Sequence, residues 1–412
     1  MDYIAYKYKL KPTKEQENIL RSCAGGCRWL WNHMLEENIR KHKEEKKFVF
    51  KHEMIVSLPK LKQEYEWLKE MPAQSLQQRL MDLDTAIRRC FKSGFGFPKF
   101  KSKNNQSDTF RIPNSPEQIH TNNKSIKIPK IGWMKWIRHR PHTGKLKSIT
   151  IKQEGNDWFV ICLCETQYAN LISEVNTSDI CGIDLGLESF CVLSDGTNIE
   201  NERFLYKKQQ TLKRRQRKLS RLDVKNNKKP TNRRKIAKQK LTKIHKDIKN
   251  TRNDFLHKVS TSIAKKWNVV GIEDLNVKGM IQNRRLAKSI SDVGWSSFRN
   301  MLKYKMEQKG GYLMLIDRFY PSTKTCSSCG QIKDMELNER TYICECGLEM
   351  SRDLNAAINI KCEAINELHR HGTYRINGQG DTSGGGVAYD TSSHVSMNCQ
   401  KFRNNFSEAI SL

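Results

Sequence analysis

Three acidic residues stand where apolar segments end, and an ionised side chain there needs a specific reason. They are Asp184 in CGIDLGL, Glu273 in VVGIEDL and Asp353 in SRDLNAAINI. A carboxylate in an apolar run is costly unless a cation or hydrogen bonds compensate it. Singly, Asp184 could cap a turn, Glu273 could pair with a lysine, and Asp353 could begin a helix. Together they fit hydrolysis of a phosphodiester by two Mg²⁺ ions, which need several hard oxygen ligands from separate elements.

A second group of candidate ligands is made of four cysteines, spaced as Cys-x-x-Cys, 14 intervening residues and Cys-x-Cys: Cys326, Cys329, Cys344 and Cys346. Four thiolates can hold one tetrahedral zinc ion, and such a ribbon needs the metal because it is too small for its own core. With all four positions filled, the zinc would be structural. Unrelated thiols are the alternative. We interpret most of the other cysteines as small buried hydrophobes: Cys162, Cys164, Cys181 and Cys191.

The acids and cysteines must be positioned by a series of strands and helices in the second half of the chain. SDICGIDLGLESFCVLSDGTNIE predicts a β-hairpin with Asp184 in its first strand, and KKWNVVGIEDLN predicts a strand ending in Glu273. GWSSFRNMLKYKMEQKG has helical periodicity and is closed by paired glycines. YLMLIDRFYPSTKTC predicts a strand that leads into the first cysteine pair, and a helix follows from Asp353.

The first half predicts a β-rich module interrupted by helices after its first strand. DYIAYKYKLKPT alternates like a strand, and helical spacing begins at Thr13, with Gly25 and Gly26 as a potential break between two helices. The aromatics in CRWLWNHML and GWMKWIRHR lie among basic residues and could stack on bases. Trp29 and Trp31 are two positions apart, so on a helix they point in different directions, and core packing is the alternative for at least one.

The charge of the chain indicates a polyanionic partner. Its 412 residues carry 74 Lys+Arg against 44 Asp+Glu, a formal charge of +30. Residues 207–249 hold 19 Lys/Arg against two acids and predict a basic helical hairpin, for which a solvated charged face is the alternative to nucleic-acid contact. No apolar run of 18 residues and no signal-peptide pattern is present, so we expect no membrane contact and a reducing, cytoplasmic location.

The order of these motifs resembles a known family. The chain resembles the transposon-encoded TnpB nucleases, relatives of the type V CRISPR effectors. The motifs that carry the resemblance are, in order, GIDLG, a basic insertion, GIEDL, PSTKTCSSCG and SRDLNAAINI. KLKPTKEQENIL and CRWLWN also resemble the family's N-terminal region. The resemblance implies that Asp184, Glu273 and Asp353 form the catalytic triad. The family usually reads Asp-Arg-Asp before its Asn-Ala pair, whereas this chain has Ser351 and Arg352 before Asp353.

The resemblance also implies an α/β multidomain fold, in which a RuvC-like RNase H fold with a zinc-ribbon insertion is preceded by a β-barrel carrying a helical insert. The implied parts are a wedge-like barrel at residues 1–10 and 96–170, a helical recognition insert at 11–95, a RuvC-like domain at 178–320 and 350–368 with the basic hairpin at 205–252, a zinc-binding insertion at 321–349, and a disordered tail at 369–412.

The implied function is an RNA-guided endonuclease that cleaves double-stranded DNA next to a short target-adjacent motif, using a Mg²⁺-dependent two-metal site. Its guide RNA would come from the transposon end, and we expect a monomer on that RNA in the prokaryotic cytosol or nucleoid. One alternative is an RNA-guided DNA-binding repressor without cleavage. Another is a guide-independent RuvC-like nuclease, which would leave the N-terminal modules unexplained. The presence of all three acids favours cleavage.

Overall fold

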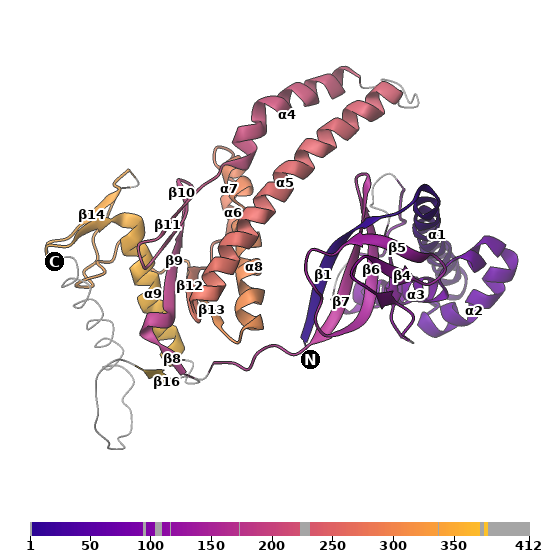
Figure 1. Ribbon diagram of the computed structural model, residues 1–412, viewed down its shortest axis with the longest axis horizontal. Helices are drawn as coiled ribbons and strands as arrows, with labels where there is room; N and C mark the ends of the chain where they lie inside the picture. Colours follow the sequence, from indigo (N-terminus) through magenta and orange to yellow (C-terminus); the bar gives the residue numbers. More distant parts are fainter. Residues whose placement is uncertain are drawn as a thin grey trace. The chain divides into compact units, whose positions relative to one another are not determined.

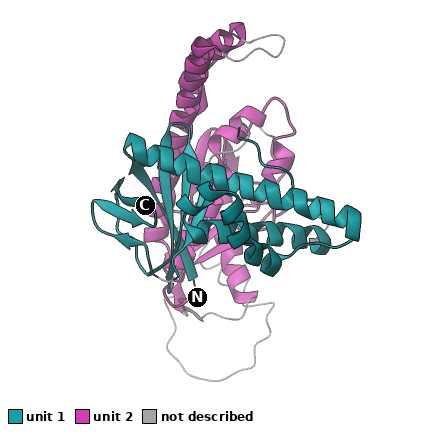
Figure 2. Cartoon of the chain, turned by 90° about the vertical axis from the view of Figure 1, so that its right-hand side faces the viewer, with its two compact units in different colours: residues 1–167 teal, residues 168–412 magenta. Residues whose placement is uncertain are grey.

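The computed structural model describes residues 2–93, 96–103, 109–115, 117–172, 174–222, 231–336, 338–370 and 375–377. The chain divides into two compact units, residues 1–167 and 168–412 (Figure 2). Among the described residues, no helix combines the length and the apolar character that a membrane span requires.

Unit 1 contains a seven-stranded antiparallel sheet in the order β2-β6-β7-β1-β5-β4-β3 (Figure 1). Its strands are β1 (Asp2–Lys11), β2 (Thr109–Pro113), β3 (His120–Thr121), β4 (Ser125–Ile128), β5 (Gly132–Ile137), β6 (Lys145–Glu154) and β7 (Asp157–Thr166). The first strand therefore lies in the middle of the sheet, between two strands that come more than 100 residues later. The described pairings leave β2 and β3 at the edges, so closure into a barrel stays a prediction.

The described residues between β1 and β2 form three α-helices: α1 (Lys14–Glu45), α2 (Lys51–Glu64) and α3 (Ala73–Ser93). Thr13 caps α1 through a capping box with Gln16. The prediction of a break at Gly25 and Gly26 is wrong, because α1 is continuous through both. A Cβ at Gly26 would lie 2.2 Å from the Sδ of Met71, so this glycine permits close packing instead.

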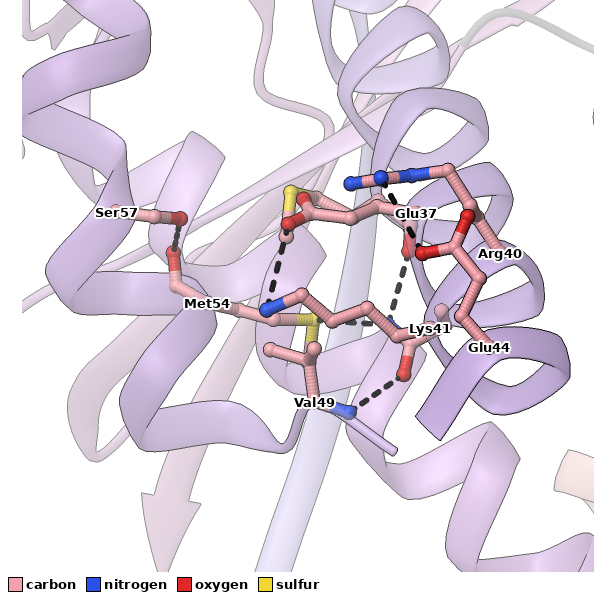
Figure 3. A network of polar contacts seen from close by, with 9 residues as sticks. Glu37, Arg40, Lys41, Glu44, Val49, Met54 and Ser57 are labelled. Carbon is pink, nitrogen blue, oxygen red and sulfur yellow. Dashed lines mark hydrogen bonds and ion pairs between the residues drawn. The ribbon is translucent and has the colours of Figure 1, made fainter. Parts of the chain in front are cut away.

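The turn from α1 into α2 is fixed by a buried amide. The Nδ2 of Asn38 donates to the carbonyl of Met34, and its Oδ1 accepts the backbone N–H of Val49 at 2.8 Å. Figure 3 shows the surroundings of Val49, with the α1 ion pairs of Glu37 with Lys41 and of Arg40 with Glu44. Because Asn38 is fully buried, its two bonds satisfy polar groups that water cannot reach.

Unit 2 is built on a five-stranded sheet in the order β11-β10-β9-β12-β13. Its strands are β9 (Ile180–Leu185), β10 (Ser189–Leu193), β11 (Asn198–Glu200), β12 (Val269–Glu273) and β13 (Tyr312–Ile316). β9, β12 and β13 pair in parallel, and β10 is antiparallel to both of its neighbours. The predicted hairpin at Asp184 and the predicted strand ending in Glu273 are confirmed.

Helices cover both faces of this sheet (Figure 1). The helices in the described part of unit 2 are α4 (Phe204–Arg221), α5 (Asn232–Lys266), α6 (Val277–Met280), α7 (Ala287–Val293), α8 (Trp295–Gln308) and α9 (Arg352–Arg370). On one face of the sheet, α5, α7 and α8 pack against the strands in one apolar core. On the other face, α9 packs against the strands in a second core. The basic segment forms α4 and the first part of α5, which pack together through Leu212 and Ile248; most of its predicted turn lies outside the described residues.

The four cysteines lie in an insertion between β13 and α9 that contains the short hairpin of β14 (Thr341–Ile343) and β15 (Glu349–Ser351). The prediction of a disordered tail from residue 369 needs correction in its described part. α9 continues to Arg370, and β16 (Arg375–Asn377) pairs in parallel with β8 (Glu174–Asn176). The rest of the predicted tail, residues 371–374 and 378–412, lies outside the described residues.

Candidate active site

The register of two adjacent parallel strands brings Asp184 and Glu273 to the same edge of the sheet. Ile183 of β9 lies opposite Ile272 of β12, so the next residue on each strand is one of the two acids. Both isoleucines belong to the core on the α5 and α8 face. Successive side chains of a strand point to opposite faces, so both acids lie on the face that α9 covers.

Two glycines let α9 lie directly on that face. Gly182 and Gly271 are register partners on β9 and β12. A Cβ at Gly182 would lie 2.0 Å from the carbonyl oxygen of Ala357, and one at Gly271 would lie 2.8 Å from the Cβ of Ala364. The helix can therefore begin beside the ends of both strands, with Asp353 in its first turn, where the helix dipole favours a negative charge.

The charges of Glu273 and Asp353 act on Asp184. Burial, and then the charges of Glu273 and Asp353, raise the pKa of Asp184 to about 8, although Arg352 opposes this. Burial also raises the pKa of Glu273, against a 2.6 Å hydrogen bond that the Ser322 hydroxyl donates to its Oε1. Both shifts mean that the metal-free site disfavours the ionised acids. A bound cation would remove this penalty.

This donor set fits magnesium. Carboxylate oxygens are hard ligands of the kind that Mg²⁺ prefers, and the three come from two strands and a helix that the cores hold in place. Asp184, Glu273 and Asp353 are thus the residues that would hold catalytic metal ions.

The four cysteines fit zinc. Their Sγ atoms all lie within 4.8 Å of one another, with Cys326 and Cys346, and likewise Cys329 and Cys344, 3.6 Å apart. A Zn–S bond of about 2.3 Å gives a tetrahedron with edges of about 3.8 Å. The Cys-x-Cys pair, although one residue shorter than the Cys-x-x-Cys pair, therefore still presents both of its sulfurs to a common centre.

Comparison with known proteins places the chain in a family. Residues 162–284 match a family described as "Probable transposase", and residues 295–360 match one described as "Cas12f1-like, TNB domain". The relatives of this chain include proteins named "Putative RNA-guided DNA endonuclease", two of them from Escherichia coli K12 and Streptomyces pristinaespiralis. InsQ of Escherichia coli K12 is 33% identical over 375 residues, with 86% of this chain and 91% of InsQ covered. This chain belongs to the TnpB family. The other relative, from Streptomyces pristinaespiralis, is 32% identical, with 86% of this chain and 88% of the relative covered.

A solved structure supports the α/β fold of this TnpB chain. Cas12f1, in a cryo-EM complex with sgRNA and target DNA, matches with a TM-score of 0.50 at 15% identity, covering 85% of this chain and 83% of that one. Residues 1–47 also match a family described as "Helix-turn-helix domain". In this TnpB chain the described part of that region is one strand, β1, followed by the single helix α1.

Two asparagines that join the acids to the cysteines went unnoticed in the sequence. Asn355 accepts the backbone N–H of Ser327 and donates to the carbonyl of Thr325 at 2.7 Å. Asn359 donates to the carbonyls of Ser322 and Thr325 at 2.8 and 2.6 Å. Both amides are fully buried. Two amides four positions apart in the apolar run LNAAINI were the available signal, since a buried polar side chain requires partners.

A cleft of about 490 Å³ lies beside the turn that follows Asp184. Leu187 and Glu188 form one side, and the basic residues Arg203, Lys288 and Arg340 contribute to the others. Arg340, from the cysteine insertion, pairs with Glu188 at 2.7 Å. The cleft thus brings a residue of the insertion beside the turn that follows Asp184, and its lining carries both basic residues and the acids Glu188 and Asp292.

The aromatic residues have mixed roles. Trp31 and Trp136 are buried, and Trp29 packs against Tyr65 and Trp67, so core packing holds for these three. Trp133 is exposed, so it remains a candidate for base stacking.

Proposed function

We propose that this TnpB chain is an RNA-guided endonuclease that cleaves double-stranded DNA beside a short target-adjacent motif. The observation that carries the proposal is the convergence of Asp184, Glu273 and Asp353 at one edge of the unit 2 sheet. A protein that only bound DNA would gain nothing from three carboxylates that repel phosphate, two of which raise the pKa of the third, Asp184.

The topology supports a RuvC-like RNase H fold for unit 2. Numbered along the chain, its strands lie in the order 3-2-1-4-5, and only the second is antiparallel. We assign the nuclease domain to residues 178–320 and 350–368 and the zinc insertion to residues 321–349. The strands at residues 1–10 and 96–170 would form the wedge-like module, and the helices at residues 11–95 would form the recognition insert.

In the proposed mechanism, the protein residues position the reaction. When bound, two Mg²⁺ ions would activate the attacking water and stabilise the leaving oxygen. Asp184 and Glu273 present their carboxylates from adjacent strand ends, and the Ser322 hydroxyl fixes one oxygen of Glu273. Asp353 closes the ligand set from the first turn of α9. The basic side chains of the neighbouring cleft would hold the phosphates on either side of the scissile bond.

The charge distribution supports a large nucleic-acid partner. Arg215, Lys218, Arg233 and Lys240 surround a cavity of about 470 Å³ between α4 and α5. Together with the net charge of +30, this favours a bound guide RNA. Base pairing with the guide would read the DNA sequence, while protein contacts follow backbone and shape.

The decisive experiment is to express the chain with its flanking genomic DNA and sequence the RNA that co-purifies. Cleavage of a plasmid library that matches this RNA is then measured with Mg²⁺ and with EDTA, for the wild type and Asp184→Ala. We expect one RNA species, guide-directed cuts beside a single short motif, and no cuts by the variant.

Other outcomes would identify the alternatives. Stable RNA and target binding without any cut would favour a repressor. Cleavage that persists after all RNA is removed would favour a guide-independent nuclease.

A further inference from the structure

Phe319 is the most exposed large hydrophobic side chain in the described part of the chain, at 85%. It lies in the loop of residues 317–322, between the end of β13 and the start of the cysteine insertion. Single exposed apolar residues are common on protein surfaces. The position and rigidity of this one call for a specific explanation.

The loop holds Phe319 in a fixed place. The backbone N–H of Phe319 donates to the Oδ1 of Asp317 at 2.7 Å, and that of Tyr320 donates to the Asp317 carbonyl at 3.1 Å. The N–H of Ser322 donates to the Tyr320 carbonyl at 2.8 Å. The Tyr320 hydroxyl reaches the carbonyl of Asn359 on α9. An exposed ring on an anchored loop is preorganised to receive a flat partner, because little conformational entropy is lost on binding.

The loop and the last residue of β13 before it are tied at three points to the strand end that carries Glu273. The backbone N–H of Asp274 donates to the carbonyl of Ile316 at 2.9 Å, and the Arg318 side chain pairs with the Asp274 carboxylate at 3.6 Å. The third tie is the bond from Ser322 to Glu273. Phe319 is three residues from Ser322, so the backbone between them spans at most about 10 Å.

We infer that Phe319 stacks on a nucleobase of the DNA strand being cut, within roughly three nucleotides of the scissile phosphate at a rise of about 3.4 Å per nucleotide. This inference rests on the proposed nuclease function. A phenyl ring offers a π-face but no hydrogen-bonding group, and every base has a matching face. Such a contact holds the strand without reading its sequence, as an enzyme programmed by its guide requires.

The first test is a photocrosslink. The Asp184→Ala variant with its co-purified guide is mixed with matched duplexes that carry 5-iododeoxyuridine at successive positions around the cut sites. We expect one position, within about three nucleotides of a cut, to crosslink to the peptide that contains residue 319. No crosslink to that peptide from any position, with crosslinks elsewhere in the protein, would overturn the inference.

The second test is kinetic. We expect Phe319→Ala to lower the single-turnover cleavage rate by about 5- to 100-fold, the range for one base–aromatic stack. Target affinity and thermal unfolding should stay at wild-type values, because guide pairing supplies the affinity and the ring is not part of a core. Phe319→Trp should restore the rate. Ile343→Ala removes an exposed apolar side chain from the neighbouring β14 and should leave the rate unchanged.

The two proposals fail in different ways. If the wild type does not cut with its own guide, the nuclease function is wrong. If the wild type cuts and Phe319→Ala cuts equally fast, the function stands and the stacking site is wrong. A loss of rate that Phe319→Trp fails to restore, or that comes with a lower unfolding temperature, would indicate a structural role for the ring and would also overturn the stacking site.

Discussion

The two candidate metal sites of this chain are built in opposite ways. The three acids lie on two strands and a helix that are held between extensive apolar cores on both faces of the sheet. The cysteine insertion has a small cluster of its own, whose buried members are Cys326, Tyr342 and Cys344. The apolar cores therefore fix the backbone positions of the three acids without a metal, whereas the cysteine site would gain its cohesion from the metal.

Because of this difference, we expect a change at the cysteine site to affect the acid site, but not the reverse. Asn355 and Asn359 hold the backbone that leads into the first cysteine pair, and Ser322 on that backbone holds Glu273. Loss of zinc should therefore disturb the acids, because it loosens this segment. Loss of an acid should leave the zinc site intact, because α9 stays packed on the sheet.

The largest expected effect comes from the acid site. Asp184→Ala or Glu273→Ala should lower the cleavage rate by about 10³-fold or more, since each removes a ligand from metal ions that contribute several kcal/mol to transition-state stabilisation. Guide and target binding, measured by filter binding, should be unchanged, and so should the zinc content. Glu307→Ala, at an exposed acid of α8, serves as the control. Wild-type cleavage by Asp184→Ala would refute the assignment.

Loss of a zinc ligand should lower the cleavage rate through the hydrogen bonds that link the cysteine insertion to the acids. Cys344→Ser should abolish stoichiometric zinc and lower cleavage by roughly 100-fold, a change of the size seen when the supports of metal ligands are removed. Hydrogen exchange should rise in residues 322–336 and 338–351 but not in β9 or β12. Cys90→Ser, at a free cysteine of α3 outside the cluster, is the control. Unfolding of the whole unit 2 sheet on loss of zinc would contradict the comparison.

Removing the hydrogen bonds that link the two sites, while keeping both sets of ligands, should lower the cleavage rate by a smaller factor. Ser322→Ala and Asn359→Ala should each lower cleavage by about 10- to 100-fold with zinc retained. Asn359→Ala should also lower the unfolding temperature, because the carbonyls of Ser322 and Thr325 lose a buried donor, at a cost of about 1–3 kcal/mol. Wild-type cleavage by both variants would show that the two sites work independently.

The raised pKa of Asp184 also predicts that replacing its carboxyl group by a neutral side chain increases the stability of the folded protein. In EDTA, the raised pKa of Asp184 means that folding favours its protonated form, so its contribution to stability is lost as pH rises from about 4 to about 8. Asp184→Asn should remove this loss and raise the unfolding temperature at pH 8 by about 2–4 °C for each kcal/mol of stability regained, with no gain near pH 4. Differential scanning calorimetry at both pH values is the measurement. Equal unfolding temperatures of the wild type and Asp184→Asn at pH 8 would contradict a cost of ionising Asp184 in the folded protein.

The sequence alone was sufficient where chemistry is local. The acids at strand ends and the hairpin at Asp184 follow from patterns within a few residues, and the convergence of the four cysteine sulfurs follows from their spacing along one short segment, residues 326–346. Contacts distant in sequence were missed. Gly25 and Gly26 predicted a break because their packing partner, Met71, lies 45 residues from Gly26. The same limit hid Gly182 and Gly271, whose role depends on α9, and Asn355 and Asn359, whose partners lie in the cysteine insertion.

The smallest expected effect concerns the position where this chain departs from its family, Ser351. This residue is exposed on β15 and pairs with Thr341, so its side chain faces solvent at the base of the insertion. Ser351→Asp could add at most a surface ion pair with a nearby arginine, which changes a free energy by about 0–1 kcal/mol. Cleavage under single-turnover conditions should therefore change by less than about fivefold, with Ser351→Asn as the uncharged control. A tenfold increase for Ser351→Asp alone would mean that an acid at this position supports the metal site, and the acid site would then depend on the insertion for charge as well as for placement.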